Sequence, residues 1–434
     1  MASETRSGEP GLTAPVATAG GWNGFLKRLV LGRLQRLREG RLELVDGRES
    51  QVFGRPAADG LRARITVRDP GFYRAAALGG SIGAAQAYRD GLWEADDLTR
   101  AVQVLARNRE ALEGLERGLT RLLQPLRSLG HALRSNSRAG SRRNIAAHYD
   151  LGNEFYELFL DSTMMYSCAR FEDLDPPASA TTEELGRALA AASVAKLDLI
   201  CRKLDLKATD RVLEIGTGWG GFAIHAARNY GCHITTTTIS PRQLEFARRR
   251  LRREGLDERV TLLDRDYRDL EGRFDKLVSI EMIEAVGHRY LDDFFALCSE
   301  RLAPGGSMVL QAIVMADRYH EDYLRRVDFI QRHIFPGSCL PSISGMLSSL
   351  KGRTDLRLTD LEDLTPDYAT TLKIWRKRFL DRRHEVEALG FSPEFVRLWE
   401  FYLRYCEGAF REHVIGDVQM VLAKPRSRPR RRGP

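Results

Sequence analysis

The chain lacks a long hydrophobic run and an N-terminal signal pattern. No apolar stretch approaches the roughly 18 residues that a membrane-spanning helix needs. The N-terminal residues also lack the basic segment followed by an apolar segment that is typical of a signal peptide. These absences favour a cytoplasmic protein.

Cysteine is scarce and scattered. The six cysteines of the 434-residue chain include no C-x-x-C pair. This spacing indicates neither a disulfide framework nor a zinc site, so we expect free thiols and no bound metal.

Acidic residues are outnumbered by basic ones, and the formal net charge is +8. An Arg-rich surface favours an anionic partner, such as a phospholipid surface or nucleic acid. An arginine-heavy composition without such a partner would give the same excess of positive charge. The net charge alone therefore does not show that the protein has an anionic partner.

The N-terminal third predicts a small α+β domain behind an irregular leader. Residues 1–21 are rich in Gly, Ser, Ala and Thr and predict disorder. Residues 22–39 predict a basic amphipathic helix, which could pack on its own domain or lie on an anionic bilayer. Three short alternating segments predict a small antiparallel sheet: 41–45, 51–53 and 61–67.

Helical patterns complete this domain. We expect helices at 69–73 and 79–93, a capping turn at 96–98, and a long amphipathic helix ending near Leu133. A Ser/Arg/Gly-rich linker at 134–143 then separates the domain 22–133 from a second domain at 144–424, and a basic tail occupies 425–434.

Strand and helix patterns alternate through the second domain. The expected strands are 232–239, 260–263, 274–280 and 307–313, and the expected helices are 241–253 and 291–302, with a turn at 304–306. Such alternation predicts an α/β fold, a doubly wound Rossmann-like parallel sheet with its ligands at the carboxyl ends of the strands.

A glycine-rich turn organises this domain. An apolar strand pattern ends at Glu214, and Gly216, Thr217, Gly218, Trp219 and Gly220 lead into a helical pattern. Glycines allow a sharp turn close to a nucleotide-like ligand, and the helix N-terminus offers free N–H groups. An acidic residue followed by G-x-G-x-G resembles the first motif of S-adenosylmethionine (SAM)-dependent methyltransferases.

Polar residues also follow the later strands. Thr238, Ile239, Ser240 and Gln243 lie where a ribose would bind, although Ser240 could simply cap the helix that starts at Pro241. Asp266 and Tyr267 offer an acceptor and an aromatic face for adenine, or form a surface loop. Glu281 and Glu284 place two carboxylates near the sulfonium.

Long motifs in a fixed order give the chain a specific resemblance. They are His148–Asn153 (HYDLGN), Tyr166–Cys168, Glu214–Gly221, Thr238–Ser240 with Gln243, Met282–Gly287 (M-x-E-x-V-G), Phe335–Pro336 with Cys339–Pro341, and Tyr405–Phe410. From residue 144 to 422 the chain resembles the cyclopropane-fatty-acyl-phospholipid synthase family. The resemblance implies a SAM-dependent class I methyltransferase that converts a cis double bond of a phospholipid acyl chain to a cyclopropane through a carbocation.

The resemblance also implies site residues. It adds Tyr166 and Ser167 to the SAM site, and it implies a bicarbonate ion as the base, held by Glu284, Tyr368 and backbone groups of Cys168 and Ile313. Cys406 matches a cysteine marked as a possible active-site thiol, although no covalent step is needed. Aromatic side chains such as Trp219 and Tyr402 would face the cation, or simply pack in the core.

Two positions depart from the family pattern. Ala285 stands where many members have His, and Gln311 stands where the bicarbonate-binding His is expected. Gln donates a hydrogen bond but carries no charge at neutral pH. Methylene- or methyl-branched products therefore remain alternatives to cyclopropanation, which is the leading expectation.

Two further alternatives concern the class of protein. An inactive SAM- or lipid-binding sensor would fit the two substitutions, whereas a nucleic-acid methyltransferase would need an Asn/Asp-Pro-Pro-aromatic motif where residues 281–287 stand. The expected partners are therefore unsaturated phospholipid chains at the anionic inner face of a membrane and not nucleic acid. The oligomeric state stays open, with a homodimer as one candidate.

Overall fold

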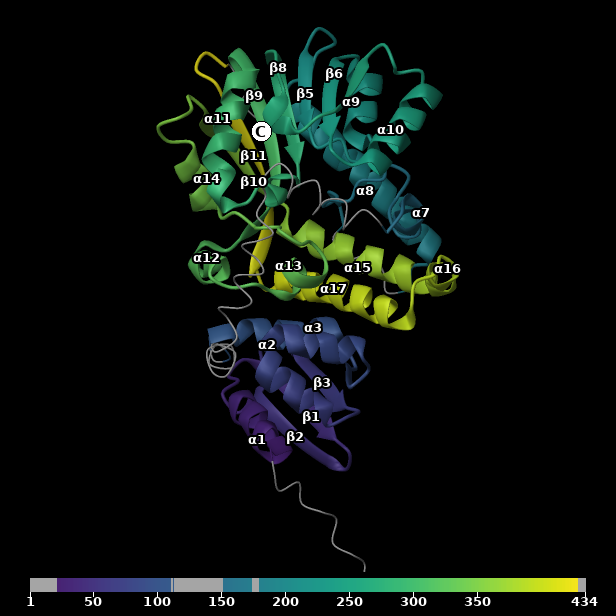
Figure 1. The fold of residues 1–434 in the computed structure, drawn as a ribbon, viewed down its shortest axis with the longest axis vertical. Helices are drawn as coiled ribbons and strands as arrows, with labels where there is room; N and C mark the ends of the chain where they lie inside the picture. Colours follow the sequence, from purple (N-terminus) through teal and green to yellow (C-terminus); the bar gives the residue numbers. More distant parts are fainter. Residues whose placement is uncertain (1–21, 111, 113–150, 174–178, 428–434) are drawn as a thin grey trace, which may run out of the picture.

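The computed structural model describes residues 22–110, 112, 151–173 and 179–427 (Figure 1). The predicted disorder of 1–21, the linker 134–143, the helix end near Leu133, the first residues of the second domain and most of the basic tail lie outside these residues. In the described parts, no helix has the length and apolarity needed to cross a bilayer.

The N-terminal part is a small α+β unit. Its elements are α1 (Trp22–Leu34), β1 (Gly40–Asp46), β2 (Glu49–Arg55), β3 (Arg62–Val67), α2 (Gly71–Arg89), β4 (Trp93–Ala95) and α3 (Leu98–Arg107). The sheet order is β2-β1-β3-β4. The predicted sheet is confirmed, but its antiparallel character is only partly correct, because β3 returns to the free side of β1 and runs parallel to it. Alternation of apolar residues reports which face is buried and not the direction of the strand.

Helix α2 differs from the two predicted helices. It runs from Gly71 to Arg89 with one non-helical residue, Gly80 (φ 59°, ψ −140°). The predicted helix at 79–93 ends too late, because Gly91 takes a positive φ and Trp93 begins β4. The predicted capping turn is present, since the Asp97 side chain accepts from the Arg100 N–H and caps α3.

The second unit holds a seven-stranded sheet. Its elements are α7 (Asn153–Glu157), α8 (Thr182–Lys203), β5 (Arg211–Ile215), α9 (Gly221–Tyr230), β6 (His233–Thr238), α10 (Pro241–Arg253), β7 (Val260–Asp264), η2 (Tyr267–Asp269), β8 (Phe274–Ile280), η3 (Ile283–Ala285), η4 (His288–Tyr290), α11 (Leu291–Arg301), β9 (Leu302–Met315), α12 (Asp317–Leu324), α13 (Phe329–His333), α14 (Ile343–Ser349), β10 (Arg357–Asp363), α15 (Thr365–Asp381), α16 (Arg383–Ala388), α17 (Pro393–Arg411) and β11 (Ile415–Ala423).

The order of this sheet is β10-β11-β9-β8-β5-β6-β7, and all neighbours are parallel except those of β11. Val212 of β5 packs in one apolar cluster with α8, α9 and α10, while Leu213 packs in another with α11 and α14. Helices therefore cover both faces, as the doubly wound prediction requires. The predicted turn at 304–306 is an irregularity inside β9, where the register with β8 jumps from Leu302 to Ser307.

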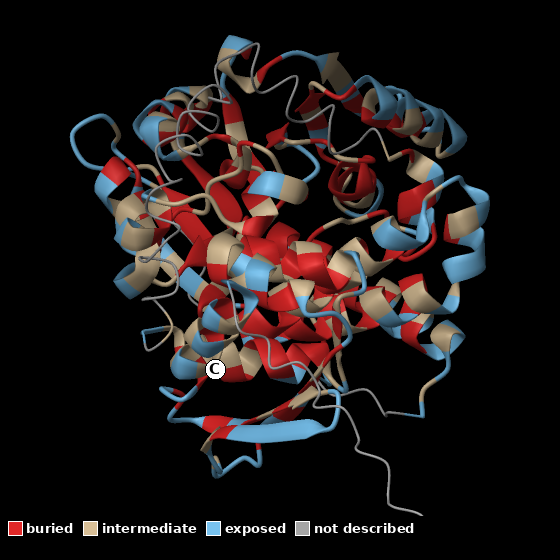
Figure 2. Cartoon of the chain, turned by 60° about the horizontal axis from the view of Figure 1, so that its bottom comes forward, coloured by how far each residue is buried: buried red, intermediate tan, exposed pale blue. Residues whose placement is uncertain are grey.

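Helices α15 and α17 lie between this sheet and the N-terminal unit (Figure 1). One apolar cluster runs from α1 and the small sheet into both helices, and buried residues continue through the middle of the molecule (Figure 2). Helix α17 meets α3 at Gly408, where a Cβ atom would lie 2.7 Å from Val102 Cγ1. The Arg397 guanidinium also donates to the carbonyls of Tyr88 and Trp93. The two units are thus packed through a shared core.

Candidate active site

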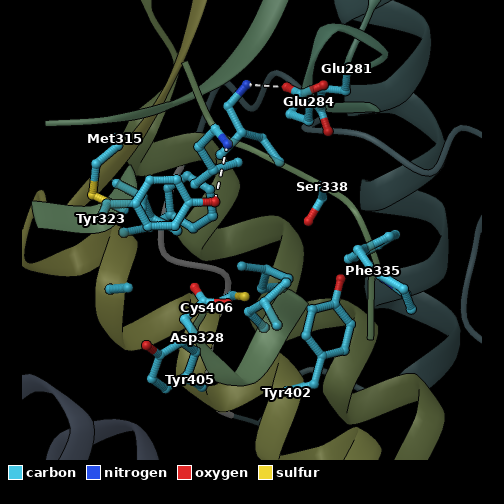
Figure 3. A pocket seen from close by; sticks show the side chains of 18 of the residues that line it. Glu281, Glu284, Met315, Tyr323, Asp328, Phe335, Ser338, Tyr402, Tyr405 and Cys406 are labelled. Carbon is cyan, nitrogen blue, oxygen red and sulfur yellow. Dashed lines mark hydrogen bonds between the residues drawn. The ribbon is translucent and has the colours of Figure 1, made fainter. Parts of the chain in front are cut away.

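One cavity of about 640 Å³ lies at the carboxyl ends of β5, β6, β7, β8 and β9. Its walls include the glycine-rich turn, the loops after these strands and residues of α17, and it continues into the N-terminal unit. Glu281 and Glu284 lie at one end of the close-up view, and Asp328, Tyr405 and Cys406 at the other (Figure 3).

The glycine-rich turn forms the floor of the cofactor end. Gly216, Gly218 and Gly220 all take positive φ, and a Cβ on Gly216 would lie 3.2 Å from Met282 Cβ. Gly216, Thr217, Gly218 and Trp219 line the cavity, whereas Gly220 does not and is the N-cap residue before α9. This shape leaves backbone close to the cavity, as an adenosyl ligand would require.

Glu214 lies at the end of β5 with its side chain buried. Its Oε2 accepts from Thr236 Oγ1 at 2.6 Å, and Thr236 Oγ1 also contacts Thr217 Oγ1 at 2.7 Å. Burial raises the pKa of Glu214 to about 8, while the Thr236 hydrogen bond opposes the shift. A cationic ligand in this cavity would favour the ionised carboxylate.

The next strand ends provide the other walls. Thr238, Ile239 and Gln243 line the cavity, and Thr238 Oγ1 donates to Gln243 Oε1 at 3.1 Å. Ser240 does not line it; its Oγ accepts from the Gln243 N–H and caps α10. The sequence already allowed this capping role.

Asp266 and Tyr267 line the cavity together with Arg268. Arg268 binds the Asp266 carboxylate through Nε at 2.8 Å and Nη2 at 2.7 Å, and its guanidinium lies 5.4 Å from the Tyr267 ring centre. The sequence did not indicate this arginine, because a single charged residue in a loop carries no distinguishing pattern.

Glu281 is the focus of the reactive end. Its Oε1 accepts from the Cys168 N–H at 2.8 Å and from Gln311 Nε2 at 2.8 Å, and its Oε2 accepts from the Tyr368 hydroxyl at 2.8 Å. The residue takes a positive φ of 46°, which places the carboxylate among these donors. Burial raises the pKa of Glu281, and the Lys196 ammonium and the three donors oppose that shift.

Glu284 lies beside it on η3. Its Oε1 accepts from the Ile313 N–H at 2.6 Å, while its Oε2 has no hydrogen-bond partner among the described residues. Burial, followed by repulsion from Glu281, raises the pKa of Glu284 to about 8. At neutral pH Glu284 is therefore mainly a neutral acid next to the Glu281 carboxylate.

The resemblance assigned these donors to a bicarbonate ion. In the structure the Cys168 N–H, Gln311 and the Tyr368 hydroxyl instead surround the Glu281 carboxylate, and the Ile313 N–H binds Glu284. The residues present do not fit an additional bicarbonate among these donors. The protein's own carboxylate occupies the position where that anion was expected.

Gln311 is held by a chain of amides. Its Nε2 also donates to Asp417 Oδ2 at 3.0 Å, and its Oε1 accepts from Gln419 Nε2 at 3.0 Å. Gln419 Oε1 in turn accepts from Lys203 Nζ at 2.8 Å. Because an ammonium only donates, Lys203 fixes the orientation of both amides and directs the Gln311 NH₂ group to Glu281.

Lys196 supplies a positive charge to this region. It lies on the inner face of α8, is fully buried, and donates to Ser167 Oγ at 2.6 Å. Burial lowers the pKa of Lys196, whereas Glu281 raises it. A lysine at a position where the helical spacing of 182–203 places apolar residues is the sequence signal that could have identified it.

Aromatic rings form much of the remaining wall. Tyr166, Phe401 and Tyr402 line the cavity, and the hydroxyls of Tyr166 and Tyr402 lie 2.9 Å apart. Cys406 also lines it, and burial raises the pKa of its thiol, so it remains protonated. Cys168 and Gln311 lie behind the wall and contact Glu281 from there.

The structure brings most of the predicted site residues to one cavity, but it places Glu281, and not Glu284, among the donors of Cys168, Gln311 and Tyr368. Of the candidates, the turn, Glu284, Tyr368, Ile313, Cys406 and the Thr238, Asp266 and Tyr166 regions border one cavity. Glu281 was noted only as the first of two carboxylates after β8. Within the described residues, no group of three or more His, Cys, Asp or Glu side chains could hold a metal ion.

Comparisons with known proteins agree with this geometry. The profile of the family described as mycolic acid cyclopropane synthetase matches residues 136–420. The chain is 40% identical over 350 residues to the tuberculostearic acid methyltransferase UfaA1 of Mycobacterium tuberculosis, covering 80% of this chain and 79% of that protein. It is 36% identical over 364 residues to the cyclopropane-fatty-acyl-phospholipid synthase of Escherichia coli K12, covering 83% and 88%.

Two solved structures have the same fold as this chain. The mycolic acid cyclopropane synthase CmaA1, complexed with SAH and CTAB, superposes with a TM-score of 0.59 at 30% identity and covers 65% of this chain and 98% of its own. Coclaurine N-methyltransferase, at 22% identity and a TM-score of 0.60, covers 78% and 98% and shares the fold.

Proposed function

The chain belongs to the mycolic acid cyclopropane synthetase family, and from this premise we propose that it methylates a cis double bond of an unsaturated phospholipid acyl chain, with Glu281 as the base. Membership makes it a SAM-dependent enzyme that transfers a methyl or methylene group to lipid acyl chains. The position of the Glu281 carboxylate is the observation that carries the finer proposal.

SAM, when bound, supplies an electrophilic methyl group. The glycine turn, Glu214 and the Thr238 and Asp266 regions would hold it, because together they border one end of the cavity with backbone, acceptors and an aromatic face. An alkene held beside that methyl group would accept it, with the sulfur keeping the electron pair of its broken bond, and would be left with a carbocation on the acyl chain. Tyr166, Phe401 and Tyr402 exclude water and present aromatic faces to this charge.

Glu281 then removes a proton from the new methyl group. Its raised pKa makes it a stronger base than an exposed carboxylate, and its hydrogen bonds to Cys168, Gln311 and Tyr368 hold both oxygens in place. Glu284, mainly neutral, adds no second charge. The electron pair of the broken C–H bond stays on the acyl chain.

The product depends on what precedes this proton loss. Direct loss closes a cyclopropane, whereas a hydride shift to the first cationic carbon followed by the same loss gives a methylene branch. We place the methylene-branched product first, because the relative at 40% identity is named a tuberculostearic acid methyltransferase and not a cyclopropane synthase, and because Gln311 and Glu281 replace the expected His and bicarbonate. The cyclopropane, supported by the relative at 36% identity, is the second candidate.

We also propose that the enzyme works in the cytoplasm at the anionic surface of the membrane. On α1, Leu26, Val30 and Leu34 pack inward, while Trp22 and Phe25 are 59% and 45% exposed. Their rings stack with centres 5.7 Å apart. Exposed aromatics beside Lys and Arg suit the interface of an anionic bilayer.

The test uses vesicles of dioleoyl phospholipid, part of it anionic, with deuteromethyl SAM. Gas chromatography with mass spectrometry should find an acyl product that gains one carbon and retains two deuteriums, and the fragmentation pattern distinguishes ring from methylene. Vesicle flotation of the Trp22→Ser/Phe25→Ser variant should show weaker binding than the matched Val52→Ser variant, which removes an exposed side chain from β2. A protein that binds SAM but incorporates no deuterium would contradict the proposal.

A further inference from the structure

The cavity does not end at the catalytic unit. Part of its wall lies inside the N-terminal unit and is formed by Val30 of α1, Leu44 and Ile65 of the sheet, Phe72 of α2 and Ala101 of α3. We call this part the N-terminal chamber. Val30, Leu44, Ile65, Phe72 and Ala101 are each no more than 6% exposed, so the chamber is enclosed by the core of the small domain.

The passage between the two parts crosses the break in α2. Gly79, Gly80 and Ser81 line the cavity, and Gly80 is the one non-helical residue within the helix. Phe401 of α17 also lines the cavity, and its ring centre lies 5.0 Å from that of Phe329 and 5.5 Å from that of Tyr88. An unbroken helix with larger side chains would narrow this passage.

The chamber suits an apolar ligand. An enclosed apolar cavity is costly to leave empty and does not attract water, because water there finds no hydrogen-bond partners. Among the residues of the N-terminal unit that line the cavity, Arg109 alone is charged and Ser81 alone carries a hydroxyl. Hydrocarbon is the chemistry that would fill it favourably.

Arginines border the same cavity from both units. Arg109 follows α3, and its guanidinium lies 4.9 Å from the ring centre of Tyr319 on α12, whose chain continues into Arg325 and Arg326. All three arginines line the cavity, as does Asp328, and Arg325 also pairs with Glu321 and Asp322. Guanidinium groups bind phosphate oxygens well, so this wall suits a phosphodiester.

Resting on the proposed function, we propose that the N-terminal chamber binds the second, unreacting acyl chain of the same phospholipid whose other chain reaches Glu281. The geometry provides two connected apolar compartments and a basic wall, which match two acyl chains joined through one phosphate-bearing head group. The small domain is therefore part of the substrate site and selects two-chain lipids.

The first test compares two substrates in each variant. Ala76→Phe in α2 and Ala101→Phe in α3 each place a ring in the cavity. Ala75→Phe, also in α2 but outside the cavity wall, is the matched control. Excluding methylenes from the chamber lowers affinity by about fourfold for each one, so kcat/KM for a dioleoyl phospholipid should fall about tenfold or more. Turnover of the single-chain oleoyl lysophospholipid with the same head group should stay unchanged.

The ratio of the two activities separates this effect from misfolding, which would lower both. An unchanged ratio in Ala76→Phe and Ala101→Phe, or the same change in Ala75→Phe, would overturn the proposal. If the native protein modifies neither lipid, the proposed function fails, and the second test still decides on the chamber.

The second test is direct. A phospholipid with one oleoyl chain and one saturated chain bearing a terminal diazirine is irradiated with the full-length protein, and cross-linked peptides are identified by mass spectrometry. We expect cross-links in α2, α3 or β1. Cross-links confined to the catalytic unit would contradict binding of the unreacting chain in the N-terminal chamber. Cross-links in the chamber that appear only when the diazirine is on the oleoyl chain would contradict it as well.

Discussion

Single carboxylates set the chemistry of this site through their surroundings. Glu281 is held by three donors and balanced by Lys196, while Glu284 and Asp417 have raised pKa values because of burial and of their negative neighbours. The three acids lie close together, so ionising more than one is unfavourable. Burial therefore raises the pKa of all three acids.

Glu214 predicts a pH dependence of cofactor binding. Its pKa of about 8 means that the free protein carries it mainly protonated at pH 7, whereas a cationic ligand favours the ionised form. SAM affinity should therefore increase as the pH rises from 6 toward 8, by up to about tenfold per unit. Calorimetry on the native protein and Glu214→Gln checks this, because the same slope in the variant would exclude Glu214 as its source.

For single residues, the sequence predicted which side chains border the cavity better than it predicted their hydrogen-bond partners. Glu214 and Thr238 were predicted because strand ends converge in a parallel sheet, whereas Tyr368, on α15, was predicted only by the family resemblance. The contact of Glu281 with Cys168, Gln311 and Tyr368 joins residues 113, 30 and 87 positions away, and no local pattern specifies it. Gln311 was expected to weaken the base site, whereas Lys203 and Gln419 orient it toward the base.

Among the elements, α17 has the closest packing against the N-terminal unit. Gly408 lets α17 approach α3, and Glu407 beside it accepts hydrogen bonds from Thr99 Oγ1 at 3.2 Å and Arg376 Nη2 at 3.1 Å. Close helix contact of this kind depends on the missing side chain.

Gly408→Ala should lower the free energy of unfolding by about 1–3 kcal/mol, because its Cβ would overlap Val102. Val102→Ala in the same background should restore part of the loss by removing the overlapping atoms. Gly32→Ala, on α1 with no atom within 4 Å of the new Cβ, is the control and should be neutral or stabilising. Denaturant titration measures all three, and equal effects at Gly408 and Gly32 would contradict the packing argument.

Element predictions succeeded where local signals are strong. Helix α10 begins at Pro241 behind its Ser240 cap, and β8 has the predicted bounds, because turn residues flank an apolar run. The direction of β3 and the structure at Trp93 were predicted wrongly, as antiparallel and as helix, since both depend on pairing with distant strands. The break at Gly80 reflects tertiary packing that a pair of glycines permits but does not require.

The whole molecule is organised around one cavity that both units share. The seven-stranded sheet provides the cofactor end, α15 and α17 the aromatic wall, and the small domain the N-terminal chamber. Composition and alternation predicted two units and the fold class, but not that their cores join, because interfaces between units carry no periodic signal.

The most direct measurement is the rate of deuteromethyl transfer to dioleoyl vesicles by Glu281→Gly, with and without added bicarbonate. Gly accepts the positive φ at this position, and its missing side chain leaves the three donors free to hold an anion. Loss of the base should lower kcat by about 10² or more. In the native protein, kcat should fall as the pH drops through the raised pKa of Glu281, because only the carboxylate accepts the proton.

Bicarbonate should restore part of the activity of Glu281→Gly but not of Glu281→Gln, whose amide still fills the site. That pair of results would identify the Glu281 carboxylate as the base that replaces a bound anion. If either variant transferred the deuteromethyl group as fast as the native protein, Glu281 would not be the base.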